Sequence, residues 1–199
     1  MKKTLSINLR GSVFNIDDDA YQLLKDYLDL IEKHFGKEEE GQEILSDIEF
    51  RIAELFKERI TDFKQVISFE DVEDIIEIMG QPEEISDPGD SEQYTRKERF
   101  GPSGYRRMYR DPDNRLLGGV CSGMAAYWGT DPLIIRIIFV VATLIFLSGA
   151  VIYLILWVVL PEAKTTAQKL EMRGEPVNIS NIGKAVKEEF ENIKKKMNL

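Results

Sequence analysis

One stretch of the sequence constrains the fold more than any other: residues 137–160 form a run of 24 residues without a charge. As one continuous helix, rising ~1.5 Å per residue, this run would reach roughly 36 Å and exceed a hydrocarbon core of about 30 Å. Helices of soluble proteins rarely stay apolar on every side for so long, because one side faces water. The run therefore predicts a single membrane-spanning helix over residues 137–160.

Ser148 and Gly149 interrupt this run near its middle and leave a second arrangement open. Two separate helices over residues 132–147 and 150–160 would measure ~24 and ~17 Å, each short of a full span. Such a pair would form a re-entrant hairpin that returns the chain to the side it came from. Because Gly and Ser are well tolerated inside membrane helices, one span is favoured over the hairpin.

Basic and aromatic side chains flank the apolar run. Arginine and lysine gather before it, whereas acidic residues balance them after it, so the positive-inside rule predicts that the preceding segment is cytoplasmic. Anionic lipid head groups attract such residues by ~1 kcal/mol each, and the absence of a groove-reading or stacking motif argues against direct nucleic-acid binding. The residues expected at the membrane interface are Arg106, Arg107, Arg110, Arg115, Tyr127, Trp128, Arg136, Tyr153 and Trp157.

The N-terminal part differs sharply in charge from the rest of the chain. Residues 1–93 carry 10 basic and 25 acidic side chains, whereas residues 94–199 carry 16 basic and 10 acidic ones. Period-2 alternation predicts strands over residues 4–9 and 12–16, and apolar residues at helical spacing predict helices over 19–35, 39–60 and 69–79. Residues 1–87 are thus expected to form a small, acidic α+β domain with a β-hairpin and a three-helix core.

This N-terminal part shows no catalytic pattern. One cysteine excludes an intramolecular disulfide framework, and one histidine excludes the usual zinc sites. We therefore predict a protein that is not an enzyme and that has no cofactor and no metal. The helical pattern of residues 19–87, which closes with Gly80-Gln81-Pro82-Glu83-Glu84-Ile85, resembles the small helical sensor domains encoded beside PadR-type repressors.

The remaining segments are a linker and a tail. Residues 88–105 are rich in polar residues, Gly and Pro, and predict a flexible linker. The tail, residues 163–199, contains an amphipathic helix over 178–199, with apolar residues at steps of three and four and lysines elsewhere. This helix is expected to lie on the membrane surface or to pair as a short coiled coil.

Residues 118–128 predict a short helix just before the apolar run. Small residues on one of its faces would let another helix approach closely, as in small-xxx-small contacts between membrane helices. Two alternatives stay open: contact with a partner or a second copy, which would make a homo-oligomer, and packing on the span of the same chain. The residues of this predicted helix-contact face are Gly119, Ser122, Gly123 and Ala126.

Residues 106–162 resemble the phage-shock protein C (PspC) domain. The resemblance rests on the turn Asp111-Pro112-Asp113-Asn114, the glycine-rich start of the short helix, Asp131-Pro132 before the apolar run and Pro161 after it. It implies a protein of the bacterial cytoplasmic (inner) membrane whose N-terminal domain is cytoplasmic. It also implies a non-enzymatic stress sensor that relays the state of the envelope to a cytoplasmic regulator or PspA-like protein. The alternative is a structural scaffold that stabilises the bilayer without signalling.

Overall fold

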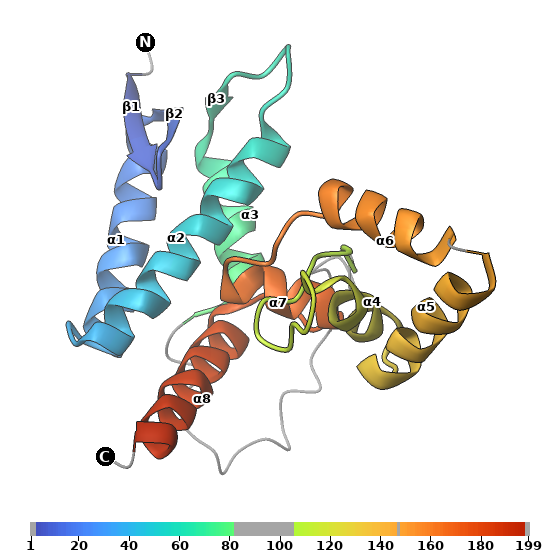
Figure 1. Cartoon of the computed structure of the whole chain (residues 1–199). Coiled ribbons are helices and arrows are strands. Elements are labelled where there is room, and N and C mark those ends of the chain that lie inside the picture. The colour runs from blue at the N-terminus through green and yellow to red at the C-terminus, as the bar shows by residue number, and fades with distance from the viewer. Residues whose placement is uncertain (1–2, 82–105, 147, 198–199) are drawn as a thin grey trace, which may run out of the picture. The chain divides into compact units, whose positions relative to one another are not determined.

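The chain folds into two units that are described separately. A computed structural model describes residues 3–81, 106–146 and 148–197. Unit 1 falls within residues 1–101 and 177–199, and unit 2 within residues 102–176. The linker predicted over residues 88–105 lies entirely outside the described residues. The chain is a mixed α+β protein that is mostly helical, as predicted (Figure 1).

Unit 1 begins with a three-stranded sheet of order β1-β2-β3 (Figure 1). β1 (Thr4–Leu9) and β2 (Ser12–Asp17) pair antiparallel across a turn at Arg10 and Gly11, as the alternating sequence predicts. Both turn residues have positive φ, 48° and 82°, which a tight two-residue hairpin requires. β3 (Val66–Ile67) lies parallel to β2 and was not predicted, because two residues are too few to show alternation.

Three helices that pack on one another, two of them (the first and second) also against this sheet, confirm the predicted three-helix core. They are α1 (Asp18–Phe35), α2 (Glu39–Arg59) and α3 (Phe69–Met79). Phe14 of β2 meets Phe56 of α2 edge to face, with ring centroids 5.4 Å apart. The largest fully buried side chains of the sheet and these helices are Phe56, Ile16, Ile31, Ile44, Ile48, Ile52, Ile67, Ile75 and Met79.

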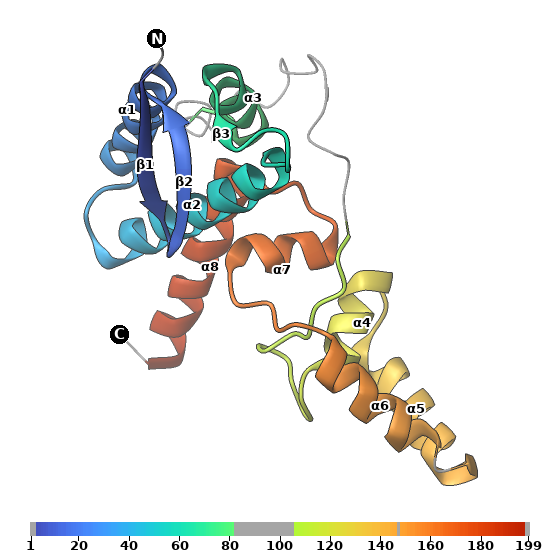
Figure 2. The ribbon, with the colours of Figure 1, turned by 90° about the horizontal axis from the view of Figure 1, so that it is seen from above.

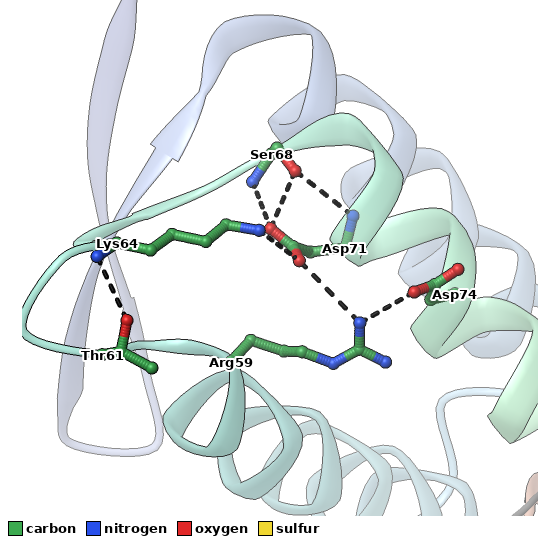
Figure 3. Close-up of polar contacts among 6 residues, drawn as sticks. All are labelled: Arg59, Thr61, Lys64, Ser68, Asp71 and Asp74. Carbon is green, nitrogen blue, oxygen red and sulfur yellow. Dashed lines mark hydrogen bonds and ion pairs between the residues drawn. The ribbon is translucent and has the colours of Figure 1, made fainter.

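A capping box begins α3, as the sequence Ser68-Phe69-Glu70-Asp71 predicts (Figure 3). The Ser68 side chain accepts from the Asp71 N–H, and the Ser68 N–H donates to Asp71 Oδ2 at 2.8 Å. Lys64 Nζ donates to Asp71 Oδ1 at 2.7 Å, and Arg59 donates to Asp74 at 2.7 Å. Burial acts to raise the pKa of Asp71, but the hydrogen bonds from Lys64 and Ser68 outweigh it and lower the pKa. The box therefore ties the loop before α3 to the helix.

The C-terminal helix, α8 (Ile179–Met197), completes unit 1 by packing on α2 (Figures 1 and 2). Its apolar residues Ile179, Ile182 and Val186 are at most 1 % exposed. At Gly183 the helix comes so close to α1 that an added Cβ would lie 3.1 Å from Phe35. This corrects the expected place of the first half of the helix, whose apolar face is covered by the chain's own N-terminal part. Farther along the same face Phe190 is half-buried and Ile193 is 45 % exposed.

In its described residues, unit 2 contains an extended segment and four helices. The helices are α4 (Val120–Trp128), α5 (Pro132–Phe146), α6 (Ser148–Val159) and α7 (Thr166–Arg173). α5 and α6 lie side by side, and α7 contacts α4 (Figures 1 and 2). A β-bridge between Arg110 and Glu162 joins the segment before α4 to the segment after α6.

The single helix predicted over residues 137–160 is wrong, because the apolar run is divided between α5 and α6. Gly149 gives the physical reason: an added Cβ there would lie 2.5 Å from the Thr143 hydroxyl and 2.8 Å from the Phe139 carbonyl oxygen. Glycine thus lets the start of α6 touch the backbone of α5. Among the described residues, no helix is both long and apolar enough to cross a bilayer.

The Asp71 network predicts a pH-dependent stability of unit 1. Because the pKa of folded Asp71 lies below its ordinary value of 3.8, the carboxylate stabilises the fold above that pH. This contribution is lost as the pH falls through the lowered pKa. We expect Asp71→Asn to cost about 1.5–3 kcal/mol near neutral pH, and the difference from wild type to shrink at pH values below 3.8. Hydrogen exchange of the α3 amides in the full chain, followed as a function of pH, measures this difference in stability.

The matched control is Asp74→Asn, which removes the same charge from an exposed ion pair of the same network. Because exposed ion pairs contribute little, this change should cost less than about 1 kcal/mol. Equal effects of the two substitutions, or a difference between wild type and Asp71→Asn that does not change with pH, would contradict the assignment.

Candidate functional site

The base of the α5–α6 hairpin is held together by backbone hydrogen bonds around Arg110. The Arg110 N–H donates to the Pro161 carbonyl oxygen at 2.8 Å, and the Ala163 N–H donates to the Arg110 carbonyl oxygen at 3.0 Å. The Asp111 N–H donates to the Gly119 carbonyl oxygen at 3.0 Å. The segment before the hairpin thus pairs with the segment after it, and both ends of the hairpin lie at the same place.

The Arg110 side chain strengthens the same base. Its Nε donates to the Leu160 carbonyl oxygen at 2.9 Å, and its Nη1 to the Gly118 carbonyl oxygen at 3.2 Å. Leu160 follows directly after α6, where carbonyl groups lack partners within the helix and attract a cation. Arg110 was predicted to lie at the membrane interface. Its side chain is half-buried and provides a hydrogen-bond donor for a carbonyl group at the end of α6.

The small residues of α4 lie against the extended segment at this base. A Cβ added at Gly119 would overlap the Asp111 carbonyl oxygen, and one added at Gly123 would overlap the Tyr109 carbonyl oxygen. The Ser122 hydroxyl is buried and donates to the Gly119 carbonyl oxygen at 3.2 Å, and Ala126 packs near Tyr109. The structure therefore places an extended backbone of the same chain, and not another helix, against Gly119 and Gly123.

Tyr109 ties this base to α7. Its hydroxyl donates to Glu171 Oε2 at 3.0 Å, and both side chains are buried. Burial first, and then the Glu171 carboxylate, raise the pKa of Tyr109 to about 12, so the phenol remains a donor. Helix α7 and Glu171 were not predicted, although Thr165-x-x-Gln168 carries the capping pattern that begins this helix.

The hairpin itself exposes an apolar surface. Of the 22 large apolar side chains that are exposed among the described residues, 15 belong to α5 and α6. Leu144, near the tip, is 80 % exposed, and Val158, near the base, is 73 % exposed. Soluble proteins rarely expose contiguous apolar surface on this scale unless it binds a membrane or a partner.

The other residues predicted at the membrane interface surround this base and hairpin. Arg106 donates to the Tyr127 carbonyl oxygen at 2.9 Å, and Arg136 donates to the Asn114 carbonyl oxygen at 3.0 Å. Arg107 and Arg115 are exposed, and Arg115 lies 3.9 Å from Glu162.

The aromatic residues predicted at the interface differ in exposure. Trp128 and Trp157 are 51 % and 48 % exposed, whereas Tyr127 and Tyr153 are half-buried. The Tyr153 hydroxyl donates to the Leu117 carbonyl oxygen.

Across residues 3–81, 106–146 and 148–197, no group of three or more His, Cys, Asp or Glu side chains is placed to hold a metal ion. The described residues of unit 2 instead form a polar, hydrogen-bonded base that carries an apolar hairpin.

Comparison with known families identifies this unit. The family model described as the PspC domain matches residues 106–163, so the chain contains a PspC domain, as the resemblance predicted. PspC proteins are related to the phage-shock, or envelope-stress, response; they are membrane-associated and generally non-enzymatic. No curated protein and no solved structure matches the chain.

The close contact at Gly123 predicts that a single methyl group there will loosen the base of the hairpin. Gly123→Ala would favour the helix by about 0.5–1 kcal/mol, but the methyl group would overlap the Tyr109 carbonyl oxygen. We expect the overlap to dominate, with a net cost of about 1–3 kcal/mol and faster hydrogen exchange of the Arg110 amide. Met124→Leu, a volume-conserving change on the same helix, is the control. An Arg110 amide as protected in Gly123→Ala as in wild type would contradict this packing.

Proposed function

We propose that this protein is a non-enzymatic regulator of the bacterial cytoplasmic membrane that reports the state of the envelope. Its α5–α6 hairpin inserts into the bilayer from the cytoplasmic side, and unit 1 remains in the cytoplasm to bind a regulator or a PspA-like protein. The observation that carries the proposal is the exposed apolar surface of the hairpin on a hydrogen-bonded polar base.

The dimensions of the hairpin fit insertion from one side. At ~1.5 Å per residue, the 15 residues of α5 and the 12 residues of α6 reach roughly 22 and 18 Å, against a hydrocarbon core of about 30 Å. Arg110 pairs with Pro161 and Ala163, so both ends of the hairpin remain on one face of the membrane. The arginines before the hairpin favour the cytoplasmic face by the positive-inside rule.

The position of α8 supports the same topology. α8 follows the hairpin in sequence but packs on α2, which precedes it. The N-terminal and C-terminal parts of unit 1 must therefore lie on the same side of the membrane. Only residues 174–178 separate α7 from α8, so a change at the base of the hairpin has a short covalent route to unit 1.

The charge of the N-terminal part favours a protein partner over lipid or nucleic acid. Residues 1–93 carry 25 acidic and 10 basic side chains, which anionic head groups and phosphate backbones repel. The resemblance of residues 19–87 to sensor domains encoded beside PadR-type repressors supports a transcription regulator as that partner. Self-association stays a further prediction.

The topology can be tested with single cysteines at Lys25 in α1 and Lys194 in α8, both exposed, in a Cys121→Ala chain. We expect a membrane-impermeant maleimide to label neither position in intact spheroplasts and both in inside-out vesicles. Because a single span would place the two residues on opposite sides, labelling of Lys194→Cys alone in spheroplasts would contradict the hairpin. Labelling each variant in detergent controls for its reactivity.

Signalling can be separated from a purely structural role by charging the hairpin. Val151 is 60 % exposed on α6. Val151→Arg should make the free energy of membrane insertion less favourable by roughly 2.5–3.5 kcal/mol, whereas Val151→Leu should leave it unchanged. In a strain that lacks the wild-type chain, we expect Val151→Leu to restore the transcriptional response to envelope damage and Val151→Arg to fail. A scaffold would give the same transcripts with both variants, and that outcome would contradict the proposal.

A further inference from the structure

We infer that unit 2 contains a lipid site: a groove between α4, α5 and α6 that holds one acyl chain of an anionic phospholipid, with Arg136 beside its head group. This inference rests on the proposed insertion of the hairpin and adds a specific ligand to it.

The groove is a concave apolar surface along the inner side of the hairpin. Its volume is about 470 Å³, which lies within the roughly 300–1,000 Å³ typical of sites for small ligands. Phe139, Val140 and Leu144 line it from α5. Ala150, Leu154 and Trp157 line it from α6.

The polar groups inside the groove already have partners within the chain. The Ser122 hydroxyl donates to the Gly119 carbonyl oxygen and the Thr143 hydroxyl to the Phe139 carbonyl oxygen, at 3.2 and 2.7 Å. The Tyr153 hydroxyl donates to the Leu117 carbonyl oxygen. A polar ligand would have to compete with these bonds, whereas an alkyl chain leaves them intact.

Arg136 supplies the charge that selects a head group. It is the one charged residue that lines the groove in the described part of the chain, and no carboxylate there forms an ion pair with it. One Nη donates to the Asn114 carbonyl oxygen at 3.0 Å, which leaves further N–H donors of the guanidinium for a phosphate. A basic residue at the mouth of an apolar groove complements an anionic phospholipid.

The length of the groove agrees with this orientation. Arg136, Val140 and Leu144 follow one another at helical spacing along one face of α5, and eight residues cover roughly 12 Å. One leaflet of a hydrocarbon core is about 15 Å thick, half of the full ~30 Å. With Arg136 at the level of the head groups, the groove would therefore run through most of one leaflet.

Trp157 allows occupancy of the groove to be measured directly. The full chain carries two tryptophans, so Trp128→Phe leaves Trp157, which lines the groove, as the only one. The purified protein in detergent is titrated with phosphatidylglycerol that has a dibrominated acyl chain, and with phosphatidylcholine that has the same chain. We expect saturable quenching near one phosphatidylglycerol per chain, reversed by unlabelled phosphatidylglycerol. Phosphatidylcholine should bind roughly five- to tenfold more weakly.

Two pairs of variants assign the signal to the groove and to the charge. Ala150→Phe fills the groove and should abolish saturable quenching, whereas Val151→Phe, on the neighbouring residue that does not line the groove, should retain it. Arg136→Gln should remove the preference for phosphatidylglycerol, and Arg136→Lys should keep it. Quenching that rises linearly with lipid, or that is equal in Ala150→Phe and Val151→Phe, would overturn the inference.

The remaining outcomes separate this site from the proposed insertion and from another occupant. Flotation of the same protein with phosphatidylglycerol vesicles reports insertion alone. If the protein floats with the vesicles but shows no saturable quenching, the lipid groove is overturned and the proposed insertion is retained. If it shows saturable quenching but does not float, the proposed insertion is overturned and the lipid groove is retained. Cross-linking of two copies through Val140→Cys, with no saturable quenching, overturns the inference in favour of a second copy in the groove.

Discussion

The structure of the PspC domain depends on the pairing of Arg110 with the chain that leaves the hairpin. Its backbone binds Pro161 and Ala163, and its guanidinium binds the carbonyl oxygens of Leu160 and Gly118. The apolar contacts between α5 and α6 are non-directional, so they do not by themselves fix where the two helices begin and end. The directional hydrogen bonds of the base therefore fix where the two helices begin and end, and they hold both ends of the hairpin at the same place.

Three glycines make this arrangement possible because they have no side chain. Gly119 and Gly123 let α4 contact the extended backbone at Tyr109 and Asp111, and Gly149 lets α6 contact the backbone of α5. In each case a Cβ would meet backbone atoms, which cannot move aside as the end of a flexible side chain can. The glycines thus determine contacts inside the domain.

Sequence patterns predicted the elements whose signal is local and missed those that depend on distant partners. The strand hairpin, helices α1, α2 and α3 of unit 1 and the capping box at Ser68 follow from alternation, helical spacing and capping residues within a few positions. β3 exists because two residues pair with β2. The apolar face of α8 has the same spacing whether lipid or α2 covers it, and the apolar run has the same composition in one helix or two. Only the tertiary fold distinguishes these cases.

The arginines of the candidate site show why a sequence pattern does not assign roles to single residues. Their density near an apolar run agrees with a match to the PspC family, whose proteins are membrane-associated, but composition does not show what each guanidinium binds. Arg106, Arg110 and Arg136 all donate to backbone carbonyl oxygens, whereas Arg115 extends toward solvent and Glu162. Arginine has five N–H donors in a planar fork. One arginine can therefore donate to a backbone carbonyl oxygen of a loop and still have N–H groups for a second acceptor. An arginine that lies near a membrane in sequence can therefore hold the domain together, meet a head group, or do both, and the carbonyl oxygens around it decide which.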